Sequence, residues 1–182
     1  MVDDPALLEA ARKLDRDALV AIFEQYAPTL YKYALRLCGD PAEADDVVGD
    51  VFSQLIDHFS RGTGPRDNLR AYLYQIAYHR VIDGSRQRKH TAVLDDSMPS
   101  GPEEAPSSQQ EDNERLDELQ LAISRYLTED QRNVIVLRYM EHFSLQETAE
   151  ITAKDINNVK VIQSRAVARL RQALSESGRE DS

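Results

Sequence analysis

The sequence predicts an all-α protein in which two small helical domains are joined by a flexible acidic linker. Apolar residues recur at helical spacing on both sides of residues 91–114, and several of these stretches begin with residues that favour helix starts. The periodicity disappears within 91–114. The 182 residues are enough for two small domains. We therefore expect domains at residues 1–90 and 115–175, a linker at 91–114 and a disordered tail at 176–182.

The expected helices follow from the apolar periodicity and from their start signals. They lie near residues 5–13, 16–38, 41–59 and 67–88, and then near 112–127, 129–141, 145–151 and 156–175. Side chains suited to cap a helix N-terminus stand before four of them, namely Asp40, Thr128, Ser144 and Asp155. Pro41 fits the first helical position after Asp40. Gln131 and Glu147 complete capping boxes with Thr128 and Ser144.

The linker carries most of the negative charge of the chain. The formal net charge is -10, and residues 91–118 contain nine acidic residues against one arginine, Arg115. Proline, serine and glutamine fill the rest of 91–114, as is typical of extended or disordered segments. The acidic total argues against non-specific coating of nucleic acid. It leaves room for local basic surfaces on the two domains.

Several classes of protein are disfavoured by what the sequence contains. We find no apolar run of about 18 residues and no basic, apolar leader, so we expect a cytoplasmic protein without membrane insertion. The single cysteine, Cys38, is interpreted as a small core residue, with a redox-sensing thiol as the alternative. We expect no cofactor, no metal site and no catalytic residues, because no P-loop, ligand cluster or nucleophile–base arrangement is evident.

The region 145–175 has the pattern of a helix-turn-helix. A short helix and a tight turn precede a helix whose apolar stripe includes Val159, Ile162 and Ala166 and whose other face is basic. In this motif the second helix enters the major groove. The residues predicted to bind duplex DNA are therefore Asn157, Asn158, Lys160, Val161, Ser164, Arg165 and Arg169. The alternative is an amphipathic surface helix whose basic face is only solvated.

Two further surfaces lie in the first domain. The helix at 41–59 has an apolar stripe and an opposite acidic face, which by itself is typical of a solvated surface. The helix that follows mixes aromatic and basic residues: Tyr74, Tyr78, His79, Arg80, Arg86, Arg88 and Lys89. Aromatic rings that stack on bases and cations that attract phosphates suit single-stranded DNA. The alternative is a set of core tyrosines beside a basic helix end. We also expect Arg80 to pair with Asp83.

Residues 127–174, "LTEDQRNVIVLRYMEHFSLQETAEITAKDINNVKVIQSRAVARLRQAL", resemble the promoter-reading C-terminal region of bacterial RNA polymerase sigma factors of the extracytoplasmic-function (ECF) type. The stretches "EADDVVGDVFSQLIDHF" and "LRAYLYQIAYHRVIDGSRQRKH" are similar to sigma region 2. The resemblance implies core RNA polymerase and promoter DNA as partners, with duplex −35 and single-stranded −10 elements. It also implies an anti-sigma factor.

The resemblance adds residues to the predicted sites. It assigns Asp45, Asp46 and Asp50 to polymerase binding. It makes the aromatic and basic residues of 74–89 the −10 reader, and it adds Arg61 and Asn68, with Arg66, from a loop that in the family helps to hold a flipped base. The resemblance implies a sigma factor that acts without catalysing a reaction.

The sequence departs from the family pattern at a few positions, and two other functions stay open. Ala153 stands where the turn usually has glycine, Tyr72 stands in the place of a tryptophan and His79 in that of an asparagine. Ile162 and Gln163 occupy positions where the family often has arginine and leucine. If the turn needs a left-handed backbone, Ala153 costs about 1 kcal/mol. The first alternative is a helix-turn-helix regulator that is not a polymerase subunit. The second is a helical interaction adaptor that does not bind DNA.

Overall fold

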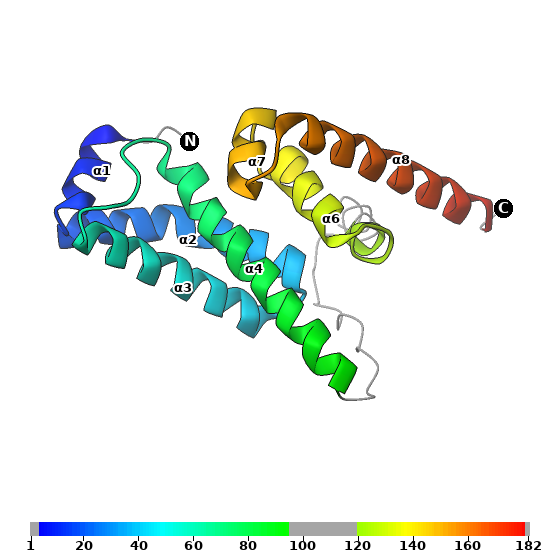
Figure 1. The fold of residues 1–182 in the computed structure, drawn as a ribbon, viewed down its shortest axis with the longest axis horizontal. Helices are drawn as coiled ribbons and strands as arrows, with labels where there is room; N and C mark the ends of the chain where they lie inside the picture. The colour runs from blue at the N-terminus through cyan, green and yellow to red at the C-terminus, as the bar shows by residue number, and fades with distance from the viewer. Residues whose placement is uncertain (1–3, 95–119, 181–182) are drawn as a thin grey trace. The chain divides into compact units, whose positions relative to one another are not determined.

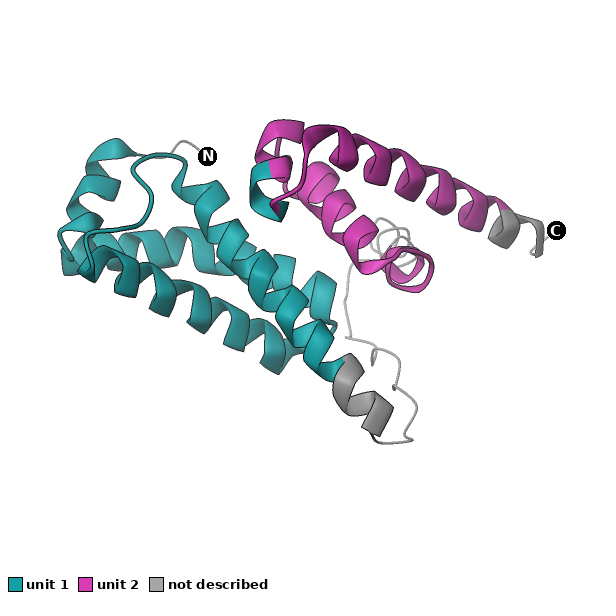
Figure 2. Ribbon diagram, in the orientation of Figure 1, with its two compact units in different colours: residues 1–97, 150–152 teal, residues 98–149, 153–182 magenta. Residues whose placement is uncertain are grey.

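The computed structural model describes residues 4–94 and 120–180, and all regular structure in these ranges is helical. The described residues belong to two units (Figure 2). The first unit centres on helices α1 to α4 and also includes residues 150–152, and the second centres on the other helical residues from 120 onward (Figure 1). The predicted fold class, two small helical domains, is confirmed. The predicted linker falls largely on residues 95–119, which lie outside the described ranges.

The first unit is built from four helices, α1 (Pro5–Arg12), α2 (Arg16–Cys38), α3 (Pro41–Ser60) and α4 (Leu69–Leu94). Helices α2, α3 and α4 pack pairwise on one another, and α1 packs on α2 and α3. The largest side chains that are fully buried in this unit are Ile22, Tyr26, Leu30, Tyr33, Val51, Leu55, Leu73 and Tyr74. These side chains form an apolar core that holds the exposed faces of α3 and α4 in place.

The predicted start of α3 is confirmed in detail. The Asp40 carboxylate accepts a hydrogen bond from the Glu43 N–H at 2.8 Å, and Pro41 occupies the first turn. The preceding helix ends at Gly39, which has a left-handed φ of 74° and donates its N–H to the Leu35 carbonyl. Glycine accepts this conformation without a steric penalty. The tight α2–α3 connection therefore follows directly from "CGDP".

From residue 120 onward the chain contains helical residues 120–126, α6 (Glu129–Ile135), η1 (Val136–Met140), α7 (Leu145–Thr152) and α8 (Ile156–Glu180). The capping boxes predicted before α6 and α7 are both present, with side-chain and backbone bonds in both directions. The Asp155 side chain accepts from the Asn157 N–H at 2.8 Å and so caps α8. The single helix predicted at 129–141 is instead an α-helix that continues as a π-helical segment.

Two predicted helix ends are wrong. Helix α4 continues to Leu94 rather than ending near residue 88, and α8 continues to Glu180, so residues 176–180 are helical rather than a disordered tail. No proline or capping glycine follows residue 88 until well past 94, and Gly178 alone does not stop α8. Residues 181 and 182 lie outside the described part of the chain.

The turn between α7 and α8 places Ala153 in the left-handed region, with a φ of 51°. An L-residue with a Cβ is strained there, whereas glycine is not. We expect Ala153→Gly to stabilise the second unit by about 1 kcal/mol, which would slow hydrogen exchange of the buried α8 amides about fivefold. Ala168→Gly, on an exposed α8 position, is the control and should speed exchange, because glycine weakens a helix interior. Equal changes in both variants would contradict strain at Ala153.

Candidate nucleic-acid interface

Helices α7 and α8 form a helix-turn-helix whose buried and exposed faces match the predicted ones. Val159, Ala166, Leu170 and Ala173 are buried, and Val159 packs with Val134 and Ala149 of the preceding helices. The predicted duplex-binding residues are all exposed; they are Asn157, Asn158, Lys160, Val161, Ser164, Arg165 and Arg169. Through these residues α8 presents amides, cations and the apolar side chain of Val161 to solvent, the chemistry that reads base edges and phosphates.

Gln163, which departs from the family pattern, has a structural role. Arg138 Nε donates to Gln163 Oε1 at 3.2 Å, and Gln163 Nε2 donates to the Tyr139 hydroxyl at 2.9 Å. Arg138 also donates to the Phe143 carbonyl. Gln163 thus joins α8 to the η1 segment, and the direction in which α8 presents its basic face is held by side-chain hydrogen bonds as well as by its apolar stripe.

A shallow groove runs beside the basic face of α8. It has a volume of about 340 Å³, and its polar lining comes from Tyr139, Lys160, Gln163, Ser164 and Arg171. Its lining includes two cations and no carboxylate. Arg171 lies outside the residues that we predicted to bind DNA, although its spacing from Lys160 and Ser164 on the helix was a usable signal. The positive surface is therefore wider than the predicted set.

The structure corrects the assignment of two tyrosines in the first unit. Tyr74 is fully buried and Tyr78 is only 6% exposed, so neither ring is available to stack on a DNA base. The Tyr74 ring packs against Tyr33, with 5.1 Å between centroids, and under the Arg70 guanidinium at 5.4 Å. α4 contacts both α2 and α3, so more than one face of it is buried. The alternative interpretation, core tyrosines, is the right one for this pair.

The charged residues of α4 form ion pairs that differ from the predicted one. Arg80 Nε lies 3.5 Å from Asp50 Oδ2 of α3 instead of pairing with Asp83, which pairs with Arg86 at 3.7 Å. Arg88 pairs with Glu43 of α3. The arginines are about half exposed or more, and such pairs are weak enough to exchange partners. His79 is exposed, and the side chain of Lys89 lies outside the described part.

The outer face of α3 is acidic, as predicted. Asp45, Asp46 and Asp50 are exposed, and the apolar stripe on the other side of the helix is buried from Ala44 to Phe59. We call these three carboxylates the acidic ridge. It borders the basic face of α4 because Asp50 contacts Arg80. The first unit therefore presents opposite charges on two adjacent helices.

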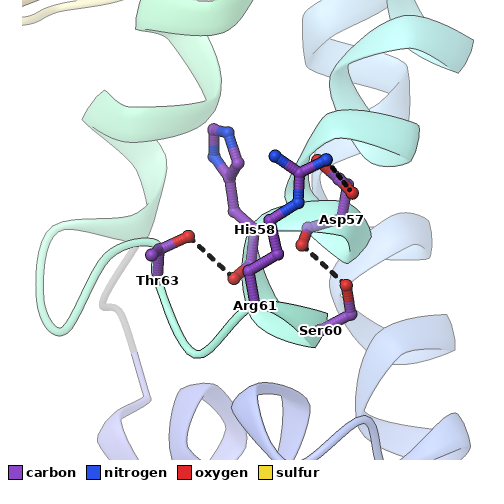
Figure 3. A network of polar contacts seen from close by, with 5 residues as sticks. All are labelled: Asp57, His58, Ser60, Arg61 and Thr63. Atoms are coloured by element: carbon purple, nitrogen blue, oxygen red, sulfur yellow. Dashed lines mark hydrogen bonds and ion pairs between the residues drawn. The ribbon is translucent and has the colours of Figure 1, made fainter.

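The loop between α3 and α4, which we call the 61–68 loop, begins with a set of polar contacts at the end of α3 (Figure 3). Arg61 pairs with Asp57 at 3.0 Å, and the Ser60 hydroxyl donates to the Asp57 carbonyl at 2.8 Å. The Thr63 hydroxyl donates to the His58 carbonyl at 2.9 Å. Arg61, Arg66 and Asn68 are exposed, so the loop presents all three predicted side chains to solvent.

The other side of the His58 side chain faces α4. His58 Nδ1 and the Tyr72 hydroxyl form a hydrogen bond, and the two rings meet edge to face. Burial raises the pKa of the Tyr72 phenol, so this hydroxyl stays protonated at neutral pH. Tyr72 stands where the family pattern has tryptophan, and here it joins the end of α3 to the first turns of α4.

Cys38 at the end of α2 is partly buried beside Glu43 and Arg88. Burial raises the pKa of its thiol to about 12, and the Glu43 carboxylate adds to this effect. The raised pKa keeps the sulfur protonated below pH 9, and the thiolate is the reactive form. This chemistry favours a core residue over a redox sensor.

We expect iodoacetamide to alkylate Cys38 in the folded chain at pH 8 at least about tenfold more slowly than in the chain unfolded in urea. The rate in the folded chain should keep rising as the pH is raised through 9 and beyond, whereas an ordinary thiol would already be approaching its plateau. Mass spectrometry of the alkylated peptide measures both rates. Equal rates in the folded and unfolded chain would mean that Cys38 is a reactive thiol.

Among residues 4–94 and 120–180 we find no group of three or more histidine, cysteine, aspartate or glutamate side chains placed to hold a metal ion. No helix in these ranges is both long and apolar enough to span a membrane.

Comparison with known families matches both units. Residues 22–91 match Sigma-70 region 2, and residues 125–172 match Sigma-70, region 4. The chain is 30% identical over 174 residues to the ECF RNA polymerase sigma factor SigL of Mycobacterium tuberculosis, covering 95% of this chain and 98% of SigL. It is 27% identical over 175 residues to the ECF RNA polymerase sigma factor BldN of Streptomyces coelicolor, covering 95% of this chain and 66% of BldN.

Solved structures agree on the fold. The sigma factor RpoE of Bartonella quintana, solved with the anti-sigma factor NepR, has a TM-score of 0.71 and 24% identity, and the match covers 85% of this chain and 95% of RpoE. CnrH, solved with the cytosolic domain of CnrY, has a TM-score of 0.71 at 20% identity, covering 95% of this chain and 97% of CnrH. At these identities the likeness concerns the fold alone.

Proposed function

This chain belongs to the extracytoplasmic-function (ECF) sigma factors of the sigma-70 family, and we propose on that basis that it binds core RNA polymerase and directs it to particular promoters. The observation that carries the proposal is the pairing of two modules on one chain. One is a region 2 unit with an acidic ridge beside a basic helix, and the other is a region 4 helix-turn-helix. Each module supplies one part of promoter recognition.

The second unit reads the duplex −35 element in this proposal. Asn157, Asn158 and Lys160 lie in the first turns of α8, where a recognition helix meets base edges. Asparagine pairs well with adenine, and lysine with guanine or phosphate. Val161 is 45% exposed among polar neighbours and suits a thymine methyl group. Arg165 and Arg169 are one and two turns further on and attract the DNA backbone.

The first unit captures the melted −10 element. The exposed side chains of α4 and of the 61–68 loop carry this part: His79, Arg80, Arg86, Arg88, Arg61, Arg66 and Asn68. Tyr74 and Tyr78 are buried. Among the residues that we predicted to bind the −10 element, His79 is therefore the one whose ring is exposed. We therefore assign base stacking to His79 and phosphate attraction to the arginines.

The acidic ridge docks on the polymerase. An acidic surface steers association with a basic partner and fixes its register. Neither DNA-binding surface alone contacts many phosphates, so both become effective only when the polymerase holds them at one promoter. The proposed partners are thus core RNA polymerase, promoter DNA and, by analogy with RpoE, an anti-sigma factor. The proposed location is the cytoplasm, and the proposed role involves no catalysis by this chain.

The test is run-off transcription with sigma-free core polymerase on supercoiled genomic fragments, with and without the chain. The proposal expects site-specific initiation only when chain and core are both present. Promoter binding that needs no polymerase would favour the helix-turn-helix regulator, which has no role for the acidic ridge. Absence of both binding and initiation on every fragment would favour the adaptor.

A further inference from the structure

Helix α1 precedes the part of the chain that matches region 2, because that match begins at residue 22. The last residue of α1, Arg12, contacts the 61–68 loop. Arg12 Nη1 donates to the Pro65 carbonyl at 2.7 Å and to the Gly64 carbonyl at 3.3 Å. These hydrogen bonds join residues that are more than fifty positions apart in the sequence. A charged donor on a carbonyl makes a stronger bond than a neutral one does.

The helix that carries Arg12 is itself fixed. Asp4 caps α1 by accepting from the Ala6 N–H at 2.9 Å, and Leu8 and Ala11 are buried against the rest of the unit. Arg12 is partly buried, in contrast to its neighbour Lys13, which is exposed and pairs with Glu9 on the same helix. The guanidinium is therefore held by a rigid element rather than by a free chain end.

The loop that Arg12 holds has an inner and an outer side. Pro65 is buried, and a Cβ on Gly64 would lie 3.1 Å from the Phe59 ring, so the backbone here is pressed against the end of α3. Arg61, Arg66 and Asn68 flank this point and are exposed. Arg12 is the donor to both the Gly64 and the Pro65 carbonyl, in a partly buried setting where a carbonyl is better satisfied by a protein donor than left without one.

We infer that Arg12 is a positioning residue for −10 recognition. Its hydrogen bonds to the Gly64 and Pro65 carbonyls, which we call the clasp, hold the 61–68 loop in one conformation. In that conformation the loop presents Arg61, Arg66 and Asn68 to an unpaired base. The inference rests on the proposed function of this loop. A loop that is already ordered loses less conformational entropy when it captures a base. The clasp acts on promoter opening and leaves polymerase docking and −35 binding unchanged.

The first measurement concerns the loop in the free, full-length chain. Arg12→Ala should speed hydrogen exchange of residues 62–68 by about tenfold, as expected for the loss of charge-assisted hydrogen bonds. Lys13→Ala removes the same charge from the residue that directly follows α1 and should leave the loop unchanged. Arg12→Lys retains one donor and should recover part of the protection. Unchanged exchange in Arg12→Ala overturns the clasp, whatever the chain does in transcription.

The second measurement concerns promoter opening with core polymerase. Arg12→Ala should lower the rate of opening on a duplex promoter by about tenfold relative to the unsubstituted chain. On a promoter that carries a pre-melted −10 segment with the captured base removed, the two chains should initiate equally. Lys13→Ala should match the unsubstituted chain on both DNAs, since an effect of charge alone would appear in this variant too.

The outcomes separate the clasp from a general structural role and from the proposed function. A loss of core binding in Arg12→Ala, or an equal loss on both DNAs, would overturn the inference in favour of a folding defect. If the unsubstituted chain never stimulates initiation, the proposed function fails and the positioning role fails with it, while loop exchange still reports whether Arg12 orders the loop. Faster loop exchange together with slower opening on duplex DNA, partly restored in Arg12→Lys, supports the inference.

Discussion

Reversing two charges on α8, with Lys160→Glu and Arg165→Glu together, is expected to lower promoter-directed initiation by about a hundredfold. Both side chains are exposed on the face that we assign to the −35 element, and neither belongs to the buried stripe. Each reversal removes a cation from the DNA surface and adds a carboxylate that the phosphates repel. Quantitative run-off transcription with excess core polymerase measures the effect at several salt concentrations.

The controls separate DNA reading from net charge and from polymerase binding. Arg16→Glu with Lys32→Glu changes the net charge by the same amount at exposed positions of α2 and should leave initiation unchanged. A second template that ends just upstream of the −10 element offers no −35 duplex, so the α8 variant and the unsubstituted chain should be equally active on it. An equal loss on both templates would mean that α8 does not act through −35 DNA.

Local sequence signals predicted the helices and their starts because capping is decided within four residues. The Asp40 cap, the Thr128 capping box and the Ser144 capping box each involve a side chain and a backbone group three positions away. Helix ends were less predictable, since no single residue stops α4 or α8. The positive φ of Leu14 and His142 also has no sequence signal, because neither residue type marks a turn as glycine does.

The candidate site was predictable where one helix face is buried and one is exposed. This holds for α8, whose apolar stripe and polar face both follow from a period of 3.6. The same periodicity does not predict the exposed face of α4, because α4 packs against two neighbouring helices. Tyr74 and Tyr78 therefore lie in the core, although basic residues stand close to them in the sequence. The partners of Arg80, Gln163 and Arg12 come from other elements, and a single sequence contains no signal for such pairs.

The acidic ridge gives the other large expected effect. Asp45→Lys with Asp46→Lys should weaken binding to core polymerase by about a hundredfold at low salt, because placing like charges against each other at an interface costs several kcal/mol. Fluorescence anisotropy of the labelled chain titrated with core enzyme measures the affinity, and the difference should shrink as salt rises. Glu9→Lys with Glu24→Lys reverses two exposed carboxylates elsewhere and should bind as the unsubstituted chain does.

The ion pair between the ridge and α4 allows a sharper version of this test. In Asp50→Arg with Arg80→Asp, the pair between α3 and α4 can re-form with its charges exchanged, and the net charge stays the same. The carboxylate has then left the ridge, so core binding should still weaken, by less than in the double lysine variant because one carboxylate is displaced instead of two. If the swapped chain binds core polymerase as tightly as the unsubstituted chain does, Asp50 contributes through its ion pair with Arg80 and not as a carboxylate of the acidic ridge. If Asp45→Lys with Asp46→Lys leaves the affinity for core polymerase unchanged, the acidic ridge is not part of the polymerase interface.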